Sequence, residues 1–98
     1  MIEITSKQRK VLEKAAHSLE PVVIVGQNGV TDSLTEKVAH SLEAHELIKV
    51  KFNDFKDDKR ELTENLCNSC GALLVRIIGN IAILYKEQEN PEKRKIKI

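Results

Sequence analysis

A short stretch with a glycine at each end, 26-GQNG-29, carries the most suggestive chemistry in the sequence. It follows the apolar run 22-VVIV-25, which is typical of a strand, and precedes a segment with the pattern of a helix. The first N–H groups of a helix lack partners and lie at the positive end of its dipole, so a loop that admits a phosphate to them forms an anion site. Glycine permits such an approach and amide side chains can donate hydrogen bonds, so the candidate ligands are Gly26, Gln27, Asn28 and Gly29. The alternative is a turn in which glycine only relieves strain, because G-x-x-G is frequent by chance.

Basic side chains near the N-terminus form a second candidate feature. Lys7, Lys10, Lys14 and His17 are spaced by three, four and three residues, which aligns them on one face of a predicted helix as a basic stripe. Because the stripe is nearly free of acidic residues it is suited to an anionic partner, although such residues ordinarily form a solvated helix surface. Lys49, Lys51 and Arg76 would add a second patch if the register of the sheet brings them to one face.

The charges are unevenly distributed along the 98 residues, although the net charge is only +1. The segment 5–19 has four basic residues against one acidic residue, and the segment 32–48 has one lysine against four acidic residues. A one-sided basic surface is typical of nucleic-acid binding, for which a near-neutral total is weaker evidence than a strongly basic one. Apolar runs long enough for a membrane span or a secretory signal are absent from the sequence, so we expect a cytoplasmic protein.

The apolar pattern predicts a single α/β domain with the element order αβαβαββ. Thr5 or Ser6 is expected to cap the start of the first helix, Gln8 can complete a capping box with Thr5, and Glu20-Pro21 is expected to end the helix. The apolar face of this helix comprises Val11, Leu12, Ala15, Ala16 and Leu19. A second helix packs through Leu34, Val38 and Leu42, and a third begins at Asp57 or Asp58, buries Leu62 and Leu66, and ends at Gly71.

The predicted strands form a four-stranded mixed sheet. The run 22–25 is apolar on both faces and is therefore predicted to be a central strand. Alternation in 47-LIKVKF-52 places Ile48, Val50 and Phe52 on the core side of the second strand. The strand-helix-strand order implies a parallel pair, and Gly79-Asn80 joins the runs 72–78 and 81–86 in an antiparallel hairpin. The domain spans residues 1–86, and residues 87–98 are predicted to be a polar, partly basic tail.

The cysteines and histidines could suggest a metal site or redox chemistry, but their spacing does not support either. Cys67 and Cys70 have C-x-x-C spacing, but no second pair completes a zinc site, and the pair closes a helix instead of opening one, which disfavours a redox role. His45 falls on the apolar face of the second predicted helix near its C-terminus, where we expect the imidazole to be packed or to face the helix dipole. Three aromatic residues, with Phe52 facing the core, give the sheet no platform for stacking bases. No cofactor and no metal are expected.

Several separated motifs resemble the YhbY family, also called the CRM domain after chloroplast RNA splicing and ribosome maturation. The motifs are 5-TSKQRKVLEKAAH-17, 15-AAHSLEPVVIVGQNGVT-31, 44-AHELIKVK-51 and 77-IIGNIAILYK-86, and they occur in the order found in the family. The resemblance runs from about Thr5 to Lys86.

The resemblance implies RNA binding. In this family the fold resembles the C-terminal domain of bacterial translation initiation factor three, and the G-x-x-G loop is compared with the KH-domain loop that clamps the backbone of single strands. Stand-alone members are associated with precursors of the large ribosomal subunit. The family often has a lysine inside the loop, whereas this chain has Gln27 and Asn28, so phosphate contact would depend on backbone amides and flanking cations.

The sequence therefore predicts a non-enzymatic, monomeric RNA-binding protein that acts on ribosomal RNA or pre-large-subunit particles. Its predicted contact residues are the four loop residues, the basic stripe and the strand lysines Lys49 and Lys51. The alternative is a protein–protein adaptor that uses the acidic second helix or the C-terminal hairpin.

Overall fold

The computed structural model of the chain describes residues 4–96. Residues 1–3 of the predicted domain and 97–98 of the predicted tail lie outside the described residues. The main elements are α1 (Ser6–Ala16), β1 (Val23–Val25), α2 (Asp32–His45), β2 (Leu47–Phe52), α3 (Lys59–Cys70), β3 (Leu73–Ile78) and β4 (Ile81–Tyr85). Two short 3₁₀ helices, η1 (Lys56–Asp58) and η2 (Pro91–Lys93), precede α3 and follow β4. The order of the main elements is the predicted αβαβαββ.

The four strands form one mixed sheet in the order β1-β2-β4-β3. β1 and β2 are parallel, with Val23 opposite Val50, and β4 is antiparallel to both β2 and β3. The parallel pair and the Gly79-Asn80 hairpin were both predicted and are confirmed. A shift of register between Leu74 and Arg76, which leaves Val75 as the extra residue in β3, has no signal in the sequence.

The prediction that β1 is a central strand was wrong, because β1 is an outer strand with a neighbour on one side only. Val23 and Val25 are buried, but Ile24 between them is 53% exposed. An apolar run predicts a strand that could be covered on both faces. The apolar run does not show whether a helix covers the second face of the strand. In this structure α1 does not extend over Ile24, so that side chain is exposed.

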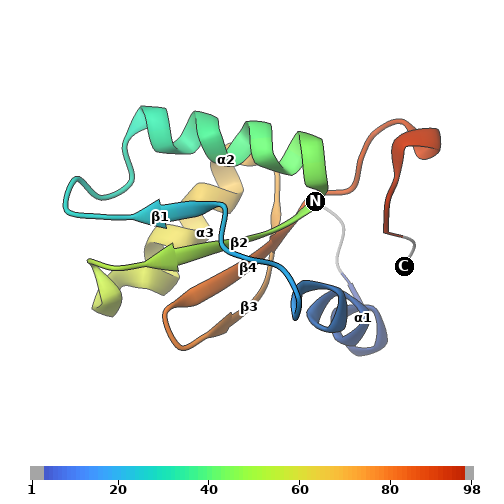
Figure 1. Ribbon diagram of the computed structural model, residues 1–98, viewed down its shortest axis with the longest axis horizontal. Helices are drawn as coiled ribbons and strands as arrows, with labels where there is room; N and C mark the ends of the chain where they lie inside the picture. The colour runs from blue at the N-terminus through green and yellow to red at the C-terminus, as the bar shows by residue number, and fades with distance from the viewer. Residues whose placement is uncertain (1–3, 97–98) are drawn as a thin grey trace.

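Helices cover both faces of the sheet, and each face has its own core (Figure 1). The larger core lies under α2 and α3 and contains Val38, Leu42 and Leu66 together with Val50 and Phe52 of β2. The smaller core lies under α1, where Leu12 and Ala16 pack against residues 47, 75, 83 and 85. The α1 face of the sheet is thus covered over part of its length, and the remainder is open to solvent.

α1 begins as predicted and ends earlier. Both hydrogen bonds of the capping box between Thr5 and Gln8 are present. The helix ends at Ala16, before Glu20-Pro21, so the predicted stop was wrong. Its apolar face is also narrower than predicted, because a single helix on a flat sheet buries a strip and leaves Val11, Ala15 and Leu19 exposed.

The segment after β4 folds back over the C-terminal end of α2. Gln88 donates from its side chain to the Glu43 carbonyl, and Lys95 donates from its ammonium to the Ala44 carbonyl. The last carbonyls of a helix lack partners within the helix, so these contacts satisfy two of them. Residues 87–96 therefore form part of the folded unit.

No helix in residues 4–96 is both long enough and apolar enough to cross a membrane.

Candidate nucleic-acid interface

The stretch 26-GQNG-29 forms a tight turn between β1 and α2. The Gly29 N–H donates to the Gly26 carbonyl at 3.0 Å, which is the hydrogen bond of a β-turn. Gly29 has a φ of 68°, in the left-handed region that favours glycine. Gly26 has no positive φ, and a Cβ placed there would meet nothing within 4 Å. The backbone thus requires glycine at 29 but not at 26, where the space above the backbone is open.

Backbone donors in this turn are only partly used. The Thr31 hydroxyl caps α2 by accepting from the Leu34 N–H at 3.1 Å, so one of the free helix donors already has a partner. Within residues 4–96 the N–H groups of Gln27 and Asn28 donate to no other protein group, and both residues are exposed. The Asp32 carboxylate in the first turn of α2 is also exposed and would oppose an anion. The donors that remain for an anion are therefore at the tip of the turn.

The basic stripe lies far from this turn. Its members Lys7, Lys10, Lys14 and His17 are all exposed. In Figure 1 the turn is at the left end of the long axis and α1 is at the lower right, on a molecule whose longest extent is 37 Å. The structure therefore does not bring the two predicted parts of the site together.

The open part of the sheet connects these two ends. Lys49 and Arg76 both pair with Ile83 across the sheet, and Lys51 lies one step further along β2 on the same face. The Lys49 ammonium donates to the His17 and Leu19 carbonyls at 3.4 and 2.9 Å, and so holds the C-terminal end of α1 against the sheet. Lys51 is exposed, and within residues 4–96 its ammonium has no hydrogen-bond or ion-pair partner, so of the two predicted strand lysines it is the one available to a ligand.

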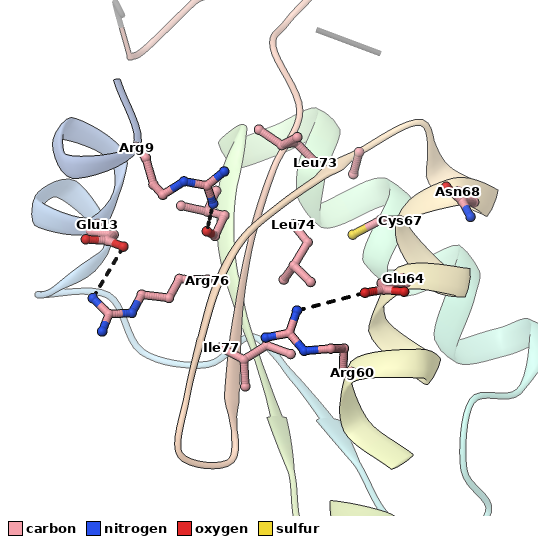
Figure 2. Close-up of a pocket in the computed structure, with 12 residues that line it drawn as sticks. Arg9, Glu13, Arg60, Glu64, Cys67, Asn68, Leu73, Leu74, Arg76 and Ile77 are labelled. Atoms are coloured by element: carbon pink, nitrogen blue, oxygen red, sulfur yellow. Dashed lines mark hydrogen bonds and ion pairs between the residues drawn. The ribbon is translucent and has the colours of Figure 1, made fainter. Parts of the chain in front are cut away.

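A groove of about 740 Å³ lies along β3, between α1 and α3 (Figure 2). Arg9, Arg60 and Arg76 line it, and sequence reasoning singled out only Arg76 of these three. Arg76 pairs with Glu13 at 3.4 Å, Arg60 pairs with Glu64 at 3.9 Å, and Arg9 donates to the Val75 carbonyl. Because each guanidinium already has a carboxylate or carbonyl partner, the groove is a weaker anion site than its three arginines suggest.

Phe55 is a neighbour of the glycine turn that sequence reasoning missed. A Cβ at Gly29 would lie 3.4 Å from Cε2 of the Phe55 ring, so the ring lies against the turn. The N–H groups of Asn53 and Asp54 donate to the Val25 carbonyl at 3.0 and 3.3 Å, which joins the two loops at one end of the sheet. No sequence pattern links residues 29 and 55, because their contact arises from the parallel pairing of β1 with β2.

The cysteines have the environment of packing residues. Both are buried near the C-terminal end of α3. Burial raises the pKa of the Cys67 thiol to about 12, with smaller contributions from Cys70 and Glu64, and burial also raises the pKa of the Cys70 thiol. A protonated thiol is a poor nucleophile and a poor metal ligand. Among the described residues no group of three or more His, Cys, Asp or Glu side chains is arranged to hold a metal.

His45 is exposed, so of its two predicted environments the packed one is wrong, while a position at the C-terminal end of the helix dipole agrees with the structure. It is the last residue of α2, directly before Glu46 and the start of β2. Helical spacing alone could not show that the core contacts of α2 end at Leu42.

Known relatives match almost the whole chain. The CRS1 / YhbY (CRM) domain pattern matches residues 4–86. The chain belongs to the CRM domain family. A Bacillus subtilis protein named "Probable RNA-binding protein YqeI" is 40% identical over 87 residues, covering 88% of this chain and 91% of the relative. An RNA-binding protein of Haemophilus influenzae is 36% identical over 90 residues, covering 91% of each chain.

The fold of this CRM domain also has a solved counterpart. The solution structure of a Staphylococcus aureus protein, described as an RNA-binding candidate, matches with a TM-score of 0.78 at 32% identity. The match covers 97% of this chain and all of the other, so the single α/β domain with its mixed sheet is shared. The predicted family is thereby confirmed, and the names of these relatives agree with the predicted RNA-binding class.

Proposed function

We propose that this CRM domain clamps the backbone of a single-stranded ribosomal RNA segment at the 26-GQNG-29 turn, without enzymatic activity, during assembly of the large ribosomal subunit. The observation that supports this proposal best is the turn itself. Its tip has two exposed residues whose N–H groups donate to no protein group within residues 4–96, and the space over Gly26 is open although the fold does not require glycine there. Backbone amides beside open space are what a phosphate needs for a close approach.

Cations elsewhere on the molecule would extend the contact. Lys51 on the open sheet face lies opposite Ile24 of β1, two residues along β2 from the Lys49 that contacts the end of α1, and the basic stripe lies on α1. Since these groups are spread along the long axis, the RNA would have to follow the molecule lengthwise. Affinity would then depend strongly on salt and weakly on sequence, because phosphates carry no sequence information. We further propose that the protein acts as a cytoplasmic monomer.

The test replaces Gln27 and Asn28 together by Asp. Two carboxylates at the tip would repel phosphates by about 1 kcal/mol or more, while both glycines stay and the backbone keeps its turn. Affinity for a single-stranded ribosomal RNA fragment, measured at two salt concentrations, should fall sharply with an unchanged melting temperature.

A matched control replaces the exposed Asn65 and Asn68 of α3 by Asp, which makes the same number of amide-to-carboxylate changes away from the turn. Equal reductions of affinity in the two double variants would mean that only net charge matters, and intact affinity in the turn variant would exclude the clamp.

The adaptor function is favoured by one observation, the 52% exposure of Ile78 beside the hairpin turn. Crosslinking of RNA to the protein in a cell extract, followed by fractionation on a gradient, separates the two functions. An RNA clamp would retain crosslinked RNA in ribosomal fractions, whereas an adaptor would not.

A further inference from the structure

Phe55 has a backbone conformation that a phenylalanine rarely adopts. Its φ and ψ are 56° and 35°, in the left-handed region, which is unfavourable for a bulky side chain. Hydrogen bonds fix it from both sides: Asp54 donates to Val25 at 3.3 Å, and Asp58 donates to the Phe55 carbonyl at 3.1 Å. Strained residues held by their surroundings are concentrated at functional sites.

The ring is also held in a fixed position while remaining accessible. One side lies against Gly29, where the absence of a side chain makes room for it, and the residue is still 44% exposed. Because such a ring is already fixed, it loses little conformational entropy when a flat ligand stacks on it.

The charges around the ring favour an uncharged ligand group. Asp54, Asp57 and Asp58 flank it in sequence, against Lys56 and Lys59. The Lys59 ammonium is directed to the Asn80 side chain at 3.5 Å. Phosphate is therefore disfavoured on this side of the turn, whereas a neutral nucleobase is not.

We propose that Phe55 stacks on an unpaired RNA base whose neighbouring phosphate lies at the 26-GQNG-29 turn. The inference rests on the proposed RNA-binding function and adds a base contact to it. A ring that stacks on any base would make the domain prefer unpaired strands over duplexes, without selecting a sequence.

Three substitutions separate stacking from packing. Phe55→Leu keeps an apolar side chain against Gly29 but removes the aromatic face, and Phe55→Tyr keeps that face. Phe55→Trp keeps it as well and introduces the sole tryptophan, since the chain has none. The probes are an unpaired single-stranded oligoadenylate of about 12 nucleotides and, as a ligand with phosphates but no bases, inorganic polyphosphate.

For oligoadenylate, Phe55→Leu should weaken binding on the order of 5- to 100-fold, while Phe55→Tyr binds as the wild type does. The tryptophan emission of Phe55→Trp should be quenched by oligoadenylate and unchanged by polyphosphate. Wild-type affinity in Phe55→Leu, or an unquenched tryptophan in a protein that binds oligoadenylate, overturns the stacking contact and leaves the clamp intact. If the wild type binds oligoadenylate but the Gln27/Asn28 double variant binds equally well, the clamp fails separately. The tryptophan signal decides the case even if Phe55→Leu is unstable.

Discussion

The backbone N–H of Gln88 donates a hydrogen bond of 3.1 Å to the buried carboxylate of Glu46. The same carboxylate accepts from the N–H groups of Lys95 and Ile96, and its residue is 1% exposed with a left-handed φ of 63°. One side chain at the end of α2 therefore holds a segment that is distant in sequence.

Replacing Glu46 by Ala should lower the free energy of unfolding by about 1–3 kcal/mol, because buried amides would have no acceptor. Glu46→Gln is the matched control, since it keeps one side-chain oxygen as acceptor and should cost less. Both values come from urea denaturation. A Glu46→Ala protein as stable as the wild type would mean that the hydrogen bonds of the Glu46 carboxylate contribute nothing to stability.

The basic stripe can be tested by its salt dependence. Replacing Lys7, Lys10 and Lys14 by Gln should reduce the slope of log K against log salt by roughly 0.7 for each phosphate of single-stranded RNA that the stripe neutralises. Folding should be unchanged, because all three side chains are exposed. Lys37→Gln together with Lys93→Gln removes exposed cations outside the stripe, and a slope reduced only by this second set would place the RNA elsewhere.

The two strand lysines should give opposite results. Lys49→Gln removes the ammonium that joins the end of α1 to the sheet, so it should lower the melting temperature and change RNA affinity little. Lys51→Gln should weaken RNA binding and leave the melting temperature unchanged. Melting curves and binding titrations of the two single variants check this, and equally weakened RNA binding in both would show that the ammonium of Lys49 also reaches RNA.

The buried cysteine predicts a decrease of stability at alkaline pH. The pKa of the Cys67 thiol is about 12 in the fold, above its ordinary value of 9.0, so from pH 9 upward the unfolded chain releases this proton while the folded chain keeps it. The contribution of the Cys67 thiol to the free energy of unfolding is fully present below pH 9 and decreases as the pH rises toward 12. Denaturation of the wild type and of Cys67→Ala between about pH 8 and pH 11 measures it. A steeper alkaline decline in Cys67→Ala than in the wild type would contradict the assignment.

Much of the fold was predictable because its signals are local. Thr5 with Gln8, Gly71 at the end of α3, and the Gly79-Asn80 pair each specify a helix end or a turn from neighbouring residues alone. The mixed sheet followed from the order of these elements.

Features that depend on distant residues were not predictable in the same way. The outer position of β1, the packing of residues 88–96 on Glu46 and the contact of Phe55 with Gly29 all arise between segments far apart in the chain. The composition of the candidate site could be proposed from residue types. The separation of the glycine turn from the basic stripe could not be predicted. Periodicity shows which face of a helix or strand a side chain lies on, but not where that element lies in the fold.

The bulge in β3 bears on whether this outer strand can pair with a strand from another molecule. An outer strand exposes unpaired backbone groups that can recruit a strand from another molecule. In β3 the extra residue Val75 interrupts the regular register, and its carbonyl is occupied by the Arg9 guanidinium. The opposite edge, β1, is only three residues long. The arginine that fastens α1 to the sheet thus also takes up one backbone acceptor of an outer strand, which leaves fewer regular acceptors for intermolecular β-pairing.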